Sequence, residues 1–132
     1  MPAFPANTAL AAALLTLLQI ALTFLIVRFR RGHRVNLGDG GDAVLLKRIR
    51  MHGNLTENAP LFLILSGMLE IGGSAPLLVR IIGPVFVIAR LCHAYGVSEW
   101  ATPGGNPFRV IGMGGTLVCL AVLAVALIIR IM

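Results

Sequence analysis

The chain has 132 residues, of which 58% are hydrophobic and 12% are charged, whereas soluble domains average about 45–50% and about 25%. Together with a mean hydropathy of +0.92, this composition argues against a disordered chain, a secreted disulfide scaffold and an ordinary cytosolic enzyme. The net charge is +6, but the basic residues stand between apolar runs. We therefore interpret them as topology signals of an integral membrane protein and expect no nucleic-acid partner.

Four segments of the chain are long enough to cross a hydrocarbon core, which takes about 20 mostly apolar residues per helix. The first and last segments are strongly apolar, whereas the second holds Glu57 and Glu70 and the third holds Arg80 and Arg90. Helices are expected at about residues 8–28, 43–71, 75–96 and 107–130. The predicted fold class is an all-α, multi-pass membrane protein with a four-helix bundle as its single domain, 1–132. Two helices with a re-entrant hairpin are the alternative.

Basic residues concentrate in the connection between the first two segments. Seven of them face only two acidic residues there: Arg28, Arg30, Arg31, Arg34, Lys47, Arg48 and Arg50. Because cytoplasmic loops carry an excess of Lys and Arg, the loop 28–50 is expected in the cytoplasm. The loop 97–107 then lies on the same side. Asp42 and Asn106 precede the second and fourth helices, where both residue types are favoured N-caps.

A polar stripe runs along the second predicted helix. Lys47, Arg50, Asn54 and Glu57 are spaced by three, four and three residues, which places all four on one face. Two cations, an amide and a carboxylate in a row suit an anionic or zwitterionic ligand, because Arg binds carboxylates through a forked pair. The alternative is a solvated helix end in which Glu57 pairs with a neighbouring Arg.

Charges inside a membrane span are costly and usually paired. Arg90 lies near the cytoplasmic end of the third predicted helix at a depth similar to that of Glu57, so we expect a Glu57–Arg90 ion pair. Glu70 and Arg80 lie at the outer ends of the same two helices and are expected to form a structural pair. His93 follows Arg90 by three residues near the same face. A satisfied core histidine is its alternative interpretation.

Arg109 stands at the start of the fourth predicted helix. With the free backbone amides of a helix N-terminus it could stabilise an anion, whereas a snorkelling anchor is the alternative. Small residues follow it on the same helix: Gly112, Gly114, Gly115 and Thr116. They indicate a face suited to close helix contact. Cys92 and Cys119 lie apart on apolar helices, so we expect neither a metal site nor a disulfide.

Three motifs resemble the MAPEG family, the membrane-associated proteins in eicosanoid and glutathione metabolism. RMHGNLTENAPL at 50–61 is similar to its second-helix signature, and ARLCHAYG at 89–96 to its third-helix motif. FRVIGM at 108–113 resembles the start of its fourth helix in bacterial members. The resemblance extends over about residues 8–130. It implies a four-helix protomer in a homotrimer in the bacterial inner membrane, with glutathione bound between subunits at the cytoplasmic side.

The resemblance also implies roles for individual residues. Matching positions give the glutathione-binding residues Arg28, Arg50, His52, Asn54, Glu57, Arg90 and His93. Arg109 matches the catalytic arginine that lowers the pKa of the glutathione thiol, a role suited to a cation beside a developing thiolate. The implied activity is that of a microsomal-type glutathione transferase or peroxidase. Its partners would be lipids and lipophilic electrophiles that arrive through the bilayer.

Two positions differ from the family pattern. Val97 and Asn58 stand where several catalytic members carry tyrosines, and the loop before Arg109 is longer than in the eicosanoid enzymes. These changes argue against a specialised leukotriene or prostaglandin synthase. A non-catalytic membrane subunit or glutathione sensor is therefore an alternative. A small four-helix exporter of cationic drugs is another, but the cations expected around Glu57 argue against it.

Overall fold

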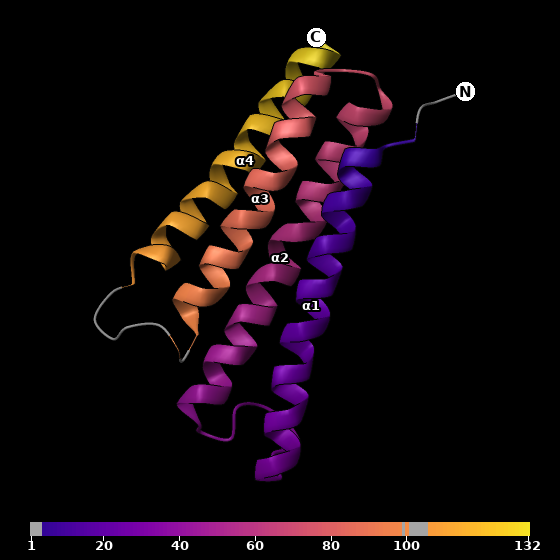
Figure 1. Ribbon diagram of the computed structural model, residues 1–132. Helices are drawn as coiled ribbons and strands as arrows, with labels where there is room; N and C mark the ends of the chain where they lie inside the picture. Colours follow the sequence, from indigo (N-terminus) through magenta and orange to yellow (C-terminus); the bar gives the residue numbers. More distant parts are fainter. Residues whose placement is uncertain (1–3, 99, 101–105) are drawn as a thin grey trace.

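The computed structural model describes residues 4–98, 100 and 106–132, which form four helices and, within those ranges, no strand. The helices are α1 (Ala6–His33), α2 (Ala43–Ile71), α3 (Pro76–Val97) and α4 (Pro107–Ile131). Both chain ends lie at the same end of the bundle (Figure 1). The all-α, four-helix class predicted from the sequence is confirmed. Most of the expected cytoplasmic loop 97–107 lies outside the described residues.

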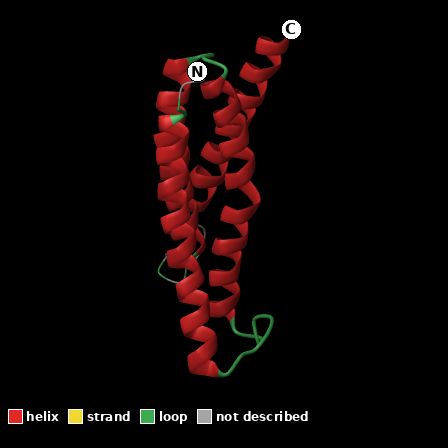
Figure 2. Cartoon of the chain, turned by 90° about the vertical axis from the view of Figure 1, so that its right-hand side faces the viewer, coloured by secondary structure: helices red, strands yellow, loops and turns green. Residues whose placement is uncertain are grey.

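Three of the helices, α1, α3 and α4, are long and apolar enough to cross a membrane by length and composition. The remaining helix, α2, carries more charge, yet it contacts all three of the others. Within the described residues α1 and α4 do not touch, because α2 and α3 separate them. The bundle is therefore built around the α2–α3 pair, with α1 on one side and α4 on the other (Figures 1 and 2).

The α1–α2 hairpin extends beyond the end of α3 and the start of α4 in both views (Figures 1 and 2). The first helix continues to His33, past the expected end near residue 28. Its apolar run stops at Val27, but arginine is a good helix former, so the helix persists through Arg28, Arg30 and Arg31. It ends where Arg34 adopts a left-handed conformation and returns its N–H to the Arg30 carbonyl.

The two expected N-caps are present. The Asp42 carboxylate accepts from the backbone N–H groups of Val44 and Leu45 at 2.8 and 2.9 Å. The Asn106 side-chain oxygen accepts from Phe108 N–H at 2.9 Å. Each cap satisfies donors that a helix start leaves without an intrahelical partner.

The expected ion pair between Glu70 and Arg80 is wrong. Glu70 instead accepts three N–H groups at the start of α1: Asn7 N at 2.9 Å, Asn7 Nδ2 at 2.7 Å and Thr8 N at 2.8 Å. The end of α2 thereby caps the beginning of α1, where a carboxylate also complements the positive end of the helix dipole. These three donors, two of them backbone N–H groups that a helix start leaves without an intrahelical partner, hold Glu70 at α1 in place of Arg80.

The core lies between α2 and its neighbours. Phe62 of α2 and Phe86 of α3 are fully buried and stack with ring centroids 3.9 Å apart. Thr8 of α1 and Ser66 of α2 share a buried hydrogen bond of 2.9 Å. Inside a bilayer, helices associate through such close packing and interhelical hydrogen bonds, since lipid tails are as apolar as leucine.

Candidate functional site

A buried arginine forms the centre of the polar cluster. Arg90 of α3 is 2% exposed, and its Nη1 donates to Asn54 Oδ1 of α2 at 2.7 Å and to the Asn54 carbonyl at 3.4 Å. Its Nε and Nη2 atoms are buried and have no hydrogen-bond partner within the described chain. A buried charge is costly unless it is paired and hydrogen-bonded. Two donors of the guanidinium are therefore buried without an acceptor among the described residues.

The expected Glu57–Arg90 ion pair is wrong. The Glu57 side chain is exposed, and it makes no hydrogen bond or ion pair with the residues that the structure describes. Three residues turn a helix by about 300°, so Glu57 is rotated by about 60° from Asn54, away from the buried face that holds Met51 and Leu55. Asn54 faces α3 and takes the position beside Arg90 that we expected for the carboxylate.

Glu57 nevertheless lies at membrane depth. The 22 residues of α3 span about 33 Å, close to the hydrocarbon thickness of about 30 Å. Arg90 is seven residues before the end of α3, or about 10 Å inside it. The Arg90–Asn54 hydrogen bond sets Asn54 at the same depth, and Glu57 lies almost one turn deeper. An exposed carboxylate at this depth must be covered by protein or by a water-filled cavity.

Close contact between α3 and α4 positions His93, the second candidate residue on α3. His93 is 7% exposed, and its backbone faces Gly112 of α4 so closely that a Cβ at Gly112 would lie 2.7 Å from His93 Cα. A Cβ at Gly96 would similarly lie 2.7 Å from Arg109 Cα. Two glycines thus let the helices meet backbone to backbone, which brings the first turn of α4 against the last turns of α3.

This contact refines the expected small-residue face of α4. Gly115 also lies at the contact, where a Cβ would be 3.2 Å from Ala89 Cβ, whereas nothing lies within 4 Å of a Cβ at Gly114. Gly96 was missed by sequence analysis because a single glycine near a helix end is also a common termination signal. Its only distinguishing signal is the spacing of seven residues from Ala89, which places both on one face of α3.

His52 faces a different helix from Asn54. Its Nε2 lies 2.7 Å from Nε2 of Gln19 on α1, and the same Gln19 amide nitrogen donates to Thr56 Oγ1 at 2.7 Å. His52 is half-buried in this α1–α2 contact. The two-residue step from His52 to Asn54 turns the helix by about 200°, so the two side chains lie on opposite sides of α2. Gln19 and Thr56 were not predicted as partners of His52, because a lone polar residue does not reveal which helix it meets.

Three candidate cations are exposed: Arg28 on α1, Arg50 on α2 and Arg109 on α4. Arg50 shares the outer stripe of α2 with Glu57. Arg28 and Arg109 lie on the two helices that do not touch each other. The structure thus brings together Asn54, Arg90, His93 and the start of α4. It leaves Arg28, Arg50 and Glu57 on outward faces of the protomer.

The arrangement favours an anionic ligand. Arg90 offers buried donors, Arg50 and Arg109 offer exposed guanidinium groups, and Asn54 and Glu57 offer acceptors on the same helix as Arg50. Guanidinium groups bind carboxylates in a forked geometry, and a nearby cation favours ionisation of a thiol. Among the described residues, no group of three His, Cys, Asp or Glu side chains could hold a metal ion.

Comparison with known proteins gives the family. Residues 8–129 match the sequence profile of the MAPEG family. The chain belongs to the MAPEG family. It is also 40% identical over 89 residues to the inner membrane protein YecN of Escherichia coli strain K12, an alignment that covers 67% of this chain and 68% of that protein. The YecN protein of Escherichia coli O6:H1 strain CFT073 gives the same values.

Family membership confirms the resemblance of the three motifs and makes this chain a MAPEG-family membrane protein. The names of the two YecN proteins state a location in the inner membrane and no reaction. The activity of this MAPEG protein therefore has to be argued from its polar cluster.

Proposed function

We propose that this MAPEG protein binds glutathione at its polar cluster and transfers the thiol to lipophilic electrophiles that enter from the bilayer. The observation that carries the proposal is Arg90, a buried cation with two nitrogen atoms left without a partner in the described chain. Glutathione has two carboxylates, one ammonium group and a thiol. A carboxylate of this tripeptide would supply the acceptors that Arg90 lacks.

The neighbouring residues complement the other groups of the ligand. Asn54 orients Arg90 through the 2.7 Å hydrogen bond, and Glu57 could accept from the ammonium group. Arg50 could bind the second carboxylate in a forked pair. Arg109, at the N-terminus of α4, would hold the thiol as a thiolate. His93 lies one turn from Arg90 and would line the pocket beside it.

We further propose that a neighbouring subunit completes the site in a homotrimer. Glu57 is exposed at membrane depth, and Arg28 lies on a helix that does not reach α4 within the protomer. A second copy placed against the outer stripe of α2 would cover Glu57 and could bring its own Arg28 to the ligand. His52, which contacts α1, would act from the edge of the site. The loops 28–50 and 97–107 would face the cytoplasm.

The proposed chemistry is a substitution at an electrophilic carbon. The thiol proton passes to solvent, the thiolate sulfur forms a C–S bond with the substrate, and the leaving group departs with its electron pair. With a lipid hydroperoxide, two glutathione molecules would instead be oxidised to the disulfide while the hydroperoxide is reduced to an alcohol and water. Both reactions need an ionised thiol next to lipid, which the position of Arg109 beside membrane-spanning helices supports.

The decisive experiment replaces Arg90 by Met in the purified, detergent-solubilised protein. Arg90→Met removes a buried charge that has no charged partner, which relieves its desolvation cost, but it also leaves Asn54 Oδ1 without its donor. The two effects oppose each other, so the thermal midpoint should change little. Glutathione binding measured by calorimetry should be lost. A variant that unfolds would indicate that Arg90 is structural, and one that binds glutathione normally would refute the proposed site.

Two further variants separate ligand contacts from general charge. Arg50→Ala and Arg31→Ala each remove one exposed arginine from the same end of the protein, but Arg31 lies outside the cluster. Only Arg50→Ala should weaken glutathione binding, by about tenfold or more for the loss of a forked pair of charge-assisted hydrogen bonds. Equal effects of the two variants would show that glutathione affinity depends only on the net charge at this end of the protein.

A non-catalytic glutathione-binding protein is the second candidate, and one observation favours it. Asn58 donates its side-chain amide to the Asn54 carbonyl at 2.8 Å, and Val97 packs against the core. Neither position presents a hydroxyl group to a thiol. Conjugation of an activated aromatic chloride by the wild-type protein, lost in Arg109→Ala, would establish the enzyme. Binding without turnover would establish the second candidate, and proton-coupled transport in vesicles would instead support an exporter.

A further inference from the structure

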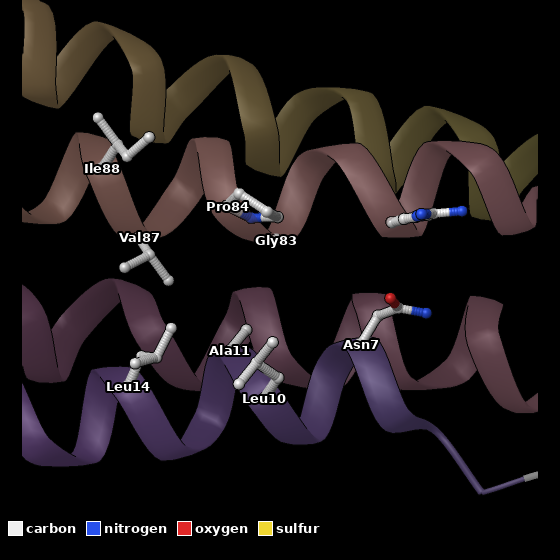
Figure 3. A pocket seen from close by; sticks show the side chains of 9 residues that line it. Asn7, Leu10, Ala11, Leu14, Gly83, Pro84, Val87 and Ile88 are labelled. Atoms are coloured by element: carbon white, nitrogen blue, oxygen red, sulfur yellow. The ribbon is translucent and has the colours of Figure 1, made fainter.

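A separate groove lies between α1 and α3, toward the ends where both helices begin. It encloses about 250 Å³. Its walls come from one side of each helix (Figure 3): Asn7, Leu10, Ala11, Leu14, Arg80, Gly83, Pro84, Val87 and Ile88. All but two of these residues are apolar or glycine. The absence of a side chain at Gly83 opens the floor, where an added Cβ would lie 3.9 Å from Ala11 Cβ.

The groove is polar at one end and apolar along the rest of its length. Asn7 lies one turn before Ala11, and Arg80 lies about one turn before Gly83, so both polar residues are at the end where the helices begin. Leu14 and Ile88 mark the other end (Figure 3). At 1.5 Å per residue, the walls from Asn7 to Leu14 and from Arg80 to Ile88 measure about 10 and 12 Å. An amphiphile has the same arrangement, with a polar group at one end and an apolar chain along the rest.

Arg80 at the polar end is available to a ligand. Its side chain is exposed and makes no hydrogen bond or ion pair within the described part of the chain. Glu70, the acid expected to neutralise it, does not line the groove and is engaged by three N–H groups of α1. Arg80 follows Pro76, the first residue of α3, by about one turn, which places it near the level of lipid headgroups.

We propose that this groove binds one acyl chain of an anionic phospholipid, with the phosphate of its headgroup on Arg80. The lipid comes from the leaflet in which α1 begins. A cation at headgroup level above an apolar slot complements a phosphate joined to a hydrocarbon chain. The site is separate from the Arg90 cluster, since ten residues of α3 place the two arginines about 15 Å apart along the helix. It does not depend on glutathione binding.

The test measures which lipids remain bound after reconstitution. Wild-type protein is placed in nanodiscs of equal parts phosphatidylglycerol and phosphatidylcholine, extracted into mild detergent, and weighed intact by native mass spectrometry. We expect retention of phosphatidylglycerol over phosphatidylcholine. Arg80→Gln should lower that preference about fivefold, the factor contributed by one cation near a membrane surface. An unchanged preference in Arg80→Gln would overturn the headgroup assignment.

A matched pair of variants tests the slot itself. Leu14→Trp fills the apolar end of the groove, whereas Leu17→Trp enlarges another exposed leucine of α1 that does not line it. Leu14→Trp should abolish retention of both lipids, and Leu17→Trp should leave retention unchanged. Equal retention in the two variants would overturn the proposal. The proposal would also be overturned if the wild-type protein carried no lipid and formed an oligomer that Leu14→Trp, but not Leu17→Trp, disrupts. That result would show that a second copy of the chain covers the groove.

Discussion

Adding a single methyl group at Gly112 should separate α4 from α3. A Cβ there would lie 2.6 Å from the Ala89 carbonyl oxygen and 2.7 Å from His93 Cα, whereas ordinary contact begins at 3.4 Å. Both atoms belong to backbone, so no side chain can rotate away to make room. The helices must move apart by at least about 0.8 Å, the shortfall between 2.6 and 3.4 Å, because the backbone nitrogen of His93 lies closer still.

The cost of that movement follows from what the contact holds together. Overpacking of a tight interface typically destabilises by about 1–3 kcal/mol, and shifting α4 also loosens the buried Thr116 and Cys119 on the same face. For a chain of this size, we expect Gly112→Ala to lower the thermal midpoint in detergent by about 5–10 °C. Since Arg109 lies on the first turn of α4, the proposed glutathione turnover should fall as well.

Gly114→Ala provides the matched control. It adds the same methyl group to the same helix, but nothing lies within 4 Å of the new atom. Its thermal midpoint should stay the same or rise slightly, because alanine restricts the unfolded chain more than glycine does. Thermal denaturation followed by circular dichroism compares the two variants. Equal midpoints would refute the claim that α3 and α4 meet backbone to backbone at Gly112.

Two further predictions concern stability alone, measured as thermal midpoints in detergent without added lipid. Glu70→Gln should cost about 1 kcal/mol, the usual value of a helix cap, because one amide oxygen cannot replace two carboxylate oxygens at the start of α1. Arg80→Gln should leave the thermal midpoint unchanged. A loss equal to that of Glu70→Gln would instead support a Glu70–Arg80 ion pair, which the structure does not show. Phe62→Ala should cost about 3–5 kcal/mol by opening a cavity against Phe86, whereas Phe24→Ala, at a position 70% exposed, should leave the midpoint within error. Comparable losses for the two phenylalanines would place the core elsewhere.

Local features of this fold could be predicted from sequence because they depend on neighbouring residues. Asp42 and Asn106 cap α2 and α4 as expected, since an N-cap needs only backbone N–H groups two or three residues away. Helices α1, α3 and α4 follow from their apolar runs for the same reason. The end of α1 at His33 was missed because arginines that end an apolar run do not end a helix.

Contacts between helices could not be predicted, because they depend on how each helix is rotated about its own axis. Both expected ion pairs were assigned by depth alone. Glu57 and Arg90 do lie within about one turn of the same depth, but Asn54 occupies the face of α2 that meets α3. Glu70 lies near Arg80 in depth too, yet the free N–H groups of Asn7 and Thr8 bind it. The roles of the glutathione-binding residues stay predictions.

The polar residues of α2 lie on three sides of the helix, and each side has a different environment. One side meets α1 through His52, and another meets α3 through Asn54. The outer side carries Glu57, which makes no hydrogen bond or ion pair with the described residues of its own protomer. A helix with polar groups in three directions cannot lie against lipid. Hydropathy therefore identifies α1, α3 and α4 as spans and passes over α2, the helix that most needs protein on every side. Its outer face is therefore where we propose that a second subunit binds.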